Sequence, residues 1–301
     1  MSIKLPKIHL DSGNPEDTKK AKGLIGFLDG QTTNPSLVAK HPELQKRFAE
    51  GKKLTETELL DFYRQVVAEI EKEIAGPISV EVNANWESTA SDMLKQAEKM
   101  FTWGRNIYIK IPTTQEGVKA AHEFVKSGGR VNMTLVFTEE QAAAVYAATL
   151  PTRQPAFLSP FMGRWDDRGY NGLDILKNAL KMYRKFGKIP QAQNPNMKGK
   201  SHVQVLAASI RTMEHFYSSI FLGADIMTVP LSILYKWVDE EKWIPDEHYR
   251  ASPTGLKNIV YKDLQFKPDF SKYKIEKEEG SLLDEGLRRF AADWTKLLIT
   301  K

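Results

Sequence analysis

The chain has 301 residues and no cysteine, and its 43 basic and 38 acidic residues leave a net charge of +5. The lack of cysteine excludes disulfides, thiolate zinc sites and cysteine nucleophiles. So small a positive excess, without a basic stripe or a nucleic-acid-binding motif, argues against a nucleic-acid partner. No apolar run approaches the roughly 18 residues of a membrane span, and the N-terminus lacks the apolar region of a signal peptide. We therefore expect a cytoplasmic protein.

Short apolar runs alternate with helical patterns along most of the chain. The runs predict eight strands, at Ile8–Asp11, Gly26–Asp29, Ile78–Val82, Ile107–Ile111, Val131–Phe137, Ala156–Ser159, Val203–Ala207 and Asp225–Val229. Most of these runs are continuously apolar, which is typical of parallel strands buried on both faces.

Between the predicted strands the apolar spacing becomes that of amphipathic helices. Helices are expected within residues 14–23, 55–70, 90–100, 114–126, 173–183, 211–221 and 231–238, and another, rich in alanine, begins at Thr138. Thr55 with Glu58, and Thr138 with Gln141, have the spacing of capping boxes at two helix starts.

Eight strands alternating with about eight helices predict an α/β fold, a single-domain (β/α)8 TIM barrel over residues 1–240. The alternative is an open doubly wound sheet. Such a sheet usually carries a glycine-rich turn after its first strand, whereas here Asp11 is followed by SGNPED.

Residues 241–301 predict a C-terminal extension of the barrel. An irregular arm extends to about residue 280 and is followed by a helix that begins at Ser281. The apolar face of this helix comprises Leu283, Leu287, Phe290, Trp294 and Leu297. We expect this face to pack on the barrel or on a neighbouring subunit of a homo-oligomer. The long connection over residues 187–201 is expected to lie away from the catalytic rim.

Lys110 is the one charged residue in the apolar stretch IYIKIP. Taking an ammonium out of water costs several kcal/mol, so a buried lysine has a lowered pKa and a neutral amine becomes available. A neutral amine can attack a carbonyl carbon and form a Schiff base. The ordinary alternative is a lysine whose amine reaches the surface.

Other polar residues stand at the ends of neighbouring predicted strands, where barrel enzymes place their active sites. Asp11, Glu81, Asn132, Thr134, Ser159 and Arg164 are in such positions. Carboxylates could move protons and amides could hold hydroxyl groups, a combination that suits carbon–carbon bond cleavage in a ketose. The histidines lack zinc-site spacing, and we expect neither a metal nor a cofactor.

Six stretches, in this order, resemble the transaldolase family. They are GQTTNPSLV (30–38), IYIKIPTTQEGVKAA (107–121), VNMTLVFTEEQA (131–142), LSPFMGRWDD (158–167), VLAASIRT (205–212) and GADIMTVP (223–230). The resemblance spans about residues 8–238. It implies that Lys110 forms a Schiff base with the substrate. Asp11 would take the proton of the C4 hydroxyl, and Glu81 with Thr134 would activate a water molecule.

The resemblance also implies a set of substrate-binding residues, with small-molecule sugar phosphates as the partners. Asn34, Asn132 and Ser159 would hold the three-carbon fragment, and Arg164, Ser209 and Arg211 would hold the terminal phosphate. Thr32 and Phe161 would complete the substrate site. The implied reaction transfers a dihydroxyacetone unit from fructose 6-phosphate or sedoheptulose 7-phosphate to an aldose phosphate, as in the pentose phosphate pathway.

Three alternatives stay open. Fructose-6-phosphate aldolase resembles this chain but carries Tyr at the position of Phe161 and Gln at that of Glu81, which favours transfer over release here. The stretch RWDDRGYNG, beside the implied phosphate arginine, leaves room for a sulfonated or otherwise altered sugar. A non-catalytic sugar-phosphate-binding protein could have the same fold, although here the expected polar positions are filled.

Overall fold

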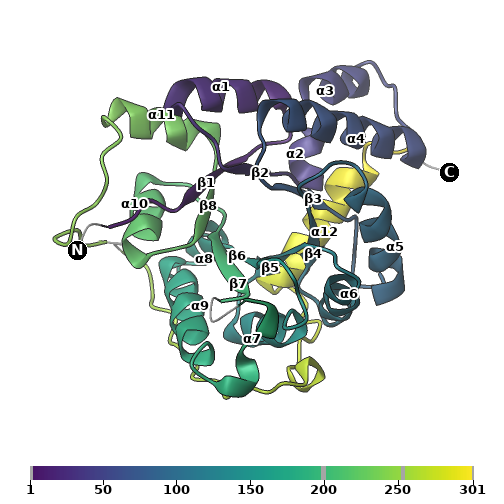
Figure 1. The fold of residues 1–301 in the computed structure, drawn as a ribbon. Helices are drawn as coiled ribbons and strands as arrows, with labels where there is room; N and C mark the ends of the chain where they lie inside the picture. The colour runs from purple at the N-terminus through teal and green to yellow at the C-terminus, as the bar shows by residue number, and fades with distance from the viewer. Residues whose placement is uncertain (1–2, 198–200, 252–254, 300–301) are drawn as a thin grey trace.

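The computed structural model describes residues 3–197, 201–251 and 255–299, and its centre is a closed barrel of eight parallel strands (Figure 1). The strands pair in chain order: β1 (Lys7–Asp11), β2 (Gly30–Thr32), β3 (Ile78–Glu81), β4 (Ile107–Pro112), β5 (Val131–Val136), β6 (Ala156–Pro160), β7 (Val203–Ala207) and β8 (Ile226–Val229). The predicted (β/α)8 barrel is therefore confirmed.

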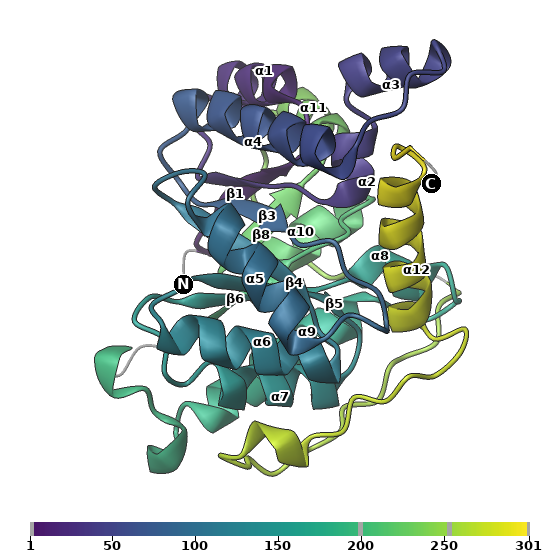
Figure 2. The ribbon, with the colours of Figure 1, turned by 90° about the vertical axis from the view of Figure 1, so that its right-hand side faces the viewer.

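Helices surround the barrel (Figures 1 and 2). In the described residues they are α1 (Pro15–Ile25), α2 (Pro35–Ala39), α3 (Pro42–Ala49), α4 (Glu56–Glu73), α5 (Ala90–Phe101), α6 (Gln115–Lys126), α7 (Glu139–Ala148), α8 (Met162–Asp166), α9 (Leu173–Phe186), α10 (Met213–Leu222), α11 (Leu231–Asp239) and α12 (Leu282–Thr295). Both expected capping boxes form, at the starts of α4 and α7. The short helices α2, α3 and α8 were not predicted. No helix in these residues is long and apolar enough to cross a membrane.

The second strand does not lie where the apolar run predicted it, over Gly26–Asp29. Gly26 instead ends α1 in a left-handed conformation, with φ of 87°, and the strand begins at Gly30. A Cβ at Gly30 would lie 2.5 Å from Nε2 of His9 on β1, so the start of this strand requires a glycine. Thr32 lines the pocket, whereas Gln31 faces the helices and accepts a hydrogen bond from Thr18 Oγ1 of α1 at 2.7 Å. Both faces of β2 are therefore polar, and it forms no apolar run.

The strands pack against two separate apolar clusters, one inside the barrel and one between the strands and the helices. These clusters show which way Lys110 points. Tyr108 on β4 stacks on Phe157 of β6, with ring centroids 4.1 Å apart, and these strands can meet only across the barrel interior. Ile109 and Ile111 belong instead to the core between strands and helices. Since side chains alternate along a strand, Lys110 points inward, one layer above an apolar floor.

The last helix lies across the end of the barrel toward which the strands point (Figure 2). It packs against α2 and β5. Trp86, in the loop after β3, donates from Nε1 to Asp284 Oδ1 at 2.8 Å, and Arg168 donates to the Gly280 carbonyl at 2.8 Å. Described residues between α11 and α12 are irregular except for the 3-10 turn η3 (Phe270–Lys272).

The described part of the 187–201 connection joins α9 to β7 at the opposite end of the barrel. It contains the 3-10 turns η1 (Pro190–Ala192) and η2 (Pro195–Met197). Asn194 donates to the carbonyl of Thr152, in the loop that precedes β6, at 2.8 Å. This connection is therefore remote from the carboxyl ends of the strands, as expected. Residues 198–200 lie outside the described residues.

Gly117→Ala should lower the free energy of unfolding by about 1–3 kcal/mol, the usual cost of overpacking. A Cβ at Gly117 in α6 would lie 1.9 Å from the carbonyl oxygen of Pro112, at the end of the strand that carries Lys110. Urea denaturation measures the loss. Gly23→Ala is the control, because nothing lies within 4 Å of its added Cβ and alanine favours the helix. Equal stability of the two variants would contradict the expectation.

Candidate active site

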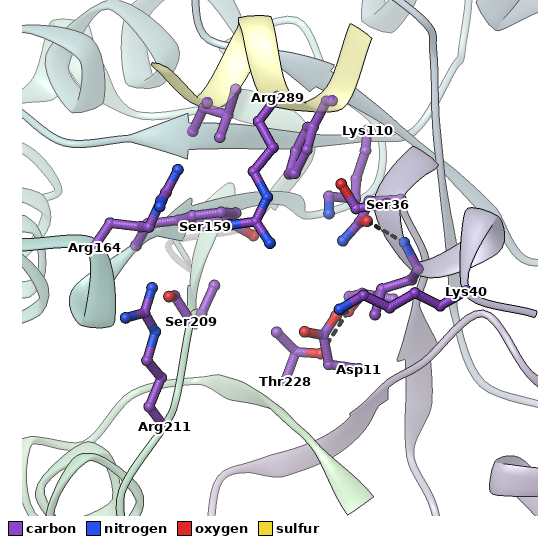
Figure 3. Close-up of a pocket in the computed structure, with 18 residues that line it drawn as sticks. Asp11, Ser36, Lys40, Lys110, Ser159, Arg164, Ser209, Arg211, Thr228 and Arg289 are labelled. Carbon is purple, nitrogen blue, oxygen red and sulfur yellow. Dashed lines mark hydrogen bonds between the residues drawn. The ribbon is translucent and has the colours of Figure 1, made fainter. Parts of the chain in front are cut away.

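A pocket opens where the carboxyl ends of the strands meet α2 and α12 (Figure 3). Nine of the twelve predicted site residues line it: Asp11, Thr32, Asn34, Lys110, Ser159, Phe161, Arg164, Ser209 and Arg211. The other three, Glu81, Asn132 and Thr134, are fully buried in the strands beside Lys110. Segments far apart in the sequence thus converge on one cavity.

The amine of Lys110 is almost completely buried. The residue is 3% exposed, and its Nζ lies 3.1 Å from Oε2 of Glu81, which is 2% exposed. The amine also donates to the carbonyl of Thr33 at 3.3 Å. Burial raises the pKa of Glu81 to about 7, although the charge of Lys110 opposes the rise. A carboxyl group with that pKa can both accept and return a proton near neutral pH.

Asp11 lies on a different wall of the pocket, at the end of β1. Its Oδ1 accepts a hydrogen bond from Oγ1 of Thr32 at 2.8 Å, and Thr32 is also 2.5 Å from the hydroxyl of Thr228 on β8. Burial raises the pKa of Asp11, and the positive charge of Lys110 is the largest opposing influence. A carboxylate with a raised pKa is a stronger base once it has lost its proton.

Asn132 is held in one orientation beside Lys110. Its Nδ2 donates to Ser79 Oγ at 3.0 Å, and its Oδ1 accepts from Ser159 Oγ at 2.7 Å. β5 places Asn132 level with Lys110, whose other neighbour at that level is Glu81. Ser159 thus connects the pocket wall to the buried layer that surrounds the amine.

Two buried oxygen atoms near the amine have no hydrogen-bond partner among the described residues. They are Oε2 of Glu81, which forms an ion pair with Nζ of Lys110 at 3.1 Å, and Oγ1 of Thr134. Glu81 is level with Lys110, whereas Thr134 on β5 is level with Pro112, two residues further along β4. Buried polar atoms are normally satisfied by protein or by ordered water, so each of these oxygen atoms can still accept a hydrogen bond.

Asn34 supports the pocket in a way that the sequence did not indicate. Its Oδ1 accepts from the backbone N–H of Leu37 at 2.8 Å and so caps α2, with Pro35 at the first position of the helix. The amide nitrogen of Asn34 stays available to the pocket. The Asn-Pro-Ser sequence therefore both starts a helix and presents a donor.

Arg164 and Arg211 form a positively charged corner. Asp167 bridges them, 2.5 Å from Nη1 of Arg211 and 3.8 Å from Nη1 of Arg164. Ser209 has a positive φ of 57°, an uncommon conformation often found at functional sites. A Cβ at Gly163 would lie 2.6 Å from the Arg211 side chain, so glycine leaves the space that this side chain crosses.

Several lining residues were missed by sequence reasoning: Ser36, Leu37, Lys40, Leu135, Ala208, Thr228, Gly286, Arg289 and Phe290. Thr228 carried a signal, because it is a polar residue within the apolar strand β8. Arg289 and Phe290 lie on α12, and no sequence pattern tells which part of the barrel a terminal helix will cover.

Comparison with known proteins gives a consistent result. A family model described as Transaldolase/Fructose-6-phosphate aldolase matches residues 8–301. A protein of Moorella thermoacetica named "Probable transaldolase" is 35% identical over 293 residues, 97% of this chain and 98% of that protein. Another of the same name, from Leptospira biflexa, is 36% identical over 228 residues, 75% of this chain and 87% of that one.

The carboxyl group of Glu81 should titrate near pH 7, against an ordinary value of 4.5. In Lys110→Met its pKa should rise further, because the positive charge that opposes the effect of burial is lost. The infrared carbonyl band of the protonated acid, followed against pH and identified by its loss in Glu81→Gln, measures both values. A lower pKa in Lys110→Met would show that the amine is not a close neighbour of Glu81.

Proposed function

Because the chain belongs to the transaldolase/fructose-6-phosphate aldolase family, we propose that it is a transaldolase that uses a Schiff base on Lys110. It would transfer a dihydroxyacetone unit from fructose 6-phosphate or sedoheptulose 7-phosphate to an aldose phosphate. The observation that carries the proposal is the buried amine of Lys110, 3.1 Å from the Glu81 carboxyl group, in a pocket with an arginine-lined corner. We place the reaction in the cytoplasm, where phosphorylated sugars are retained by their charge.

The reaction begins when Lys110 gives its excess proton to Glu81 and the neutral amine attacks the keto carbon C2. The carbinolamine that forms loses the former carbonyl oxygen as water and becomes a protonated imine. Glu81 returns the proton that this loss requires. The pKa of about 7 suits Glu81 to both transfers. A water molecule held by Glu81 and Thr134 would carry protons between the carboxyl group and the changing C2 oxygen.

Cleavage needs a base at the C4 hydroxyl, and we assign that part to Asp11. It takes the hydroxyl proton, the C3–C4 bond breaks, and the bonding electrons move to C3 as the imine becomes an enamine. The aldose phosphate leaves with a new carbonyl group at its C1. The second half repeats these steps in reverse with another aldose phosphate, and hydrolysis of the imine finally frees Lys110. The hydrogen bond from Thr32 orients the carboxylate that acts here.

The remaining residues bind the substrate. The amide groups of Asn34 and Asn132 and the hydroxyl of Ser159 would hold the hydroxyl groups of the three-carbon unit. The Arg164–Arg211 corner would take the phosphate, because guanidinium groups match its oxygen atoms in pairs. In the free protein Asp167 occupies these donors, and the phosphate would compete with that carboxylate.

Release of free dihydroxyacetone, the aldolase reaction, is the second candidate. It requires a proton for the enamine carbon. Phe161 lines the pocket and packs edge-on against Phe137, with ring centroids 5.8 Å apart. Its ring offers no proton, so the enamine would persist until an acceptor aldehyde arrives. This feature favours transfer.

Borohydride reduction in the presence of fructose 6-phosphate tests the proposal. We expect a three-carbon adduct on the peptide that contains Lys110, by mass spectrometry, and its loss when an acceptor aldose phosphate is added first. Lys110→Met should abolish the adduct. Lys40→Met is the control, because Lys40 also lines the pocket but is exposed, and it should keep the adduct. An adduct on Lys40 alone would overturn the assignment.

Phe161→Tyr should raise the rate of dihydroxyacetone release without acceptor by about 100-fold, the lower limit for a positioned general acid, because a phenol can supply the missing proton. An enzymatic assay for free dihydroxyacetone measures this rate. Phe161→Leu removes the ring without adding a donor and should leave release slow. If both variants release dihydroxyacetone equally fast, loss of the ring and not gain of a donor controls the outcome.

A further inference from the structure

Arg289 reaches the pocket from outside the barrel. It stands on α12, and its side chain points into the cavity toward the corner that contains Arg164 and Ser209 (Figure 3). Its neighbour Arg288 does not line the pocket and instead pairs with Asp284, at 3.0 Å, on the same helix. The side chains of these consecutive arginines therefore differ in place: that of Arg288 pairs within α12, and that of Arg289 lines the pocket.

The guanidinium of Arg289 is only weakly neutralised. Its Nε lies 4.0 Å from Asp293 Oδ2, and that carboxylate also accepts a hydrogen bond from Ser36 and pairs with Lys296 at 2.7 Å. Burial and the charge of Arg289 lower the pKa of Arg164, as expected when two guanidinium groups share one corner. The corner formed by Arg164 and Arg211, together with Arg289, thus carries more positive than negative charge. A bound anion would reduce the repulsion between the guanidinium groups.

The position of α12 is fixed by contacts with the barrel rim. Ser36 on α2 donates to Asp293, and Trp86 donates to Asp284. Gly286, one turn before Arg289, packs so closely on Leu135 that a Cβ would lie 2.7 Å from Leu135 Cδ2. The helix is therefore an ordered wall of the pocket, and Arg289 faces the cavity in a defined place.

We propose that Arg289 is a third arginine for the anionic end of the substrate, so that the C-terminal helix of the chain completes its active site. This inference rests on the proposed function and specifies its substrate. A phosphate ester carries close to two negative charges at neutral pH, and three guanidinium groups around one anion favour it over a singly charged sulfonate. Arg289 would bind the far end of the sugar and take no part in the chemistry at Lys110.

Kinetics with fructose 6-phosphate and an acceptor test the proposal. Arg289→Ala should raise KM about tenfold, the lower range for a hydrogen bond to a charged group, because the side chain is 52% exposed. The kcat should stay within about twofold, and Arg289→Lys should recover part of the loss. Arg288→Ala is the matched control and should behave as wild type. An unchanged KM in Arg289→Ala, or a fall in kcat alone, would overturn the proposal.

Two further measurements separate this proposal from the proposed function. Inorganic phosphate, titrated by calorimetry, should bind wild type and Arg288→Ala alike and Arg289→Ala about tenfold more weakly, whether or not turnover occurs. Equal phosphate affinity in all three would overturn the role of Arg289. Borohydride trapping with unphosphorylated dihydroxyacetone should label Lys110 equally in all three proteins. If wild type is not labelled, the Schiff base on Lys110 is contradicted and the proposed function fails. The phosphate titration then tests the role of Arg289 by itself.

Discussion

The site depends on one buried pair, the amine of Lys110 and the carboxyl group of Glu81, 3.1 Å apart. Each charge costs several kcal/mol to remove from water, and a buried pair seldom repays that cost in stability. In the proposed reaction the pair provides a short path for a proton. Burial raises the pKa of Glu81 to about 7, so its carboxyl group can take up and return a proton near neutral pH.

The barrel buries this pair and aligns its two residues. Tyr108 and Phe157 fill the interior below Lys110, so water cannot reach the amine from underneath. The pairing of β3, β4 and β5 sets Glu81, Lys110 and Asn132 at one level. Helices on the outside bury the alternate side chains of the same strands. The apolar packing that stabilises the fold is therefore also what fixes the distance between amine and carboxyl group.

The sequence predicted the features that strand alternation dictates and failed where packing between distant segments decides. A lysine between β-branched residues has to face either the helices or the barrel interior, and Ile109 and Ile111 fit only the helix side. The second strand was placed four residues too early because its buried side chains are polar on both faces: Thr32 lines the pocket, and Gln31 hydrogen-bonds to Thr18 of α1. Arg289 gave no signal, because its position depends on how α12 docks on Leu135 and α2 and not on its own neighbours in the sequence.

In the proposed function, the positively charged corner would set substrate choice by charge, without a change of fold. Asp167 lies between Arg164 and Arg211 and lowers their attraction for any anion, so a weakly charged group gains little by displacing it. A doubly charged group gains more from the same arginines, and more again when a further guanidinium approaches from α12. In the proposed function, the internal carboxylate would raise the charge that a substrate must carry, while the chemistry would depend on the carbonyl group and the C4 hydroxyl at the other end. Selection and catalysis would then be controlled by residues on opposite sides of one pocket, and each could change without disturbing the other.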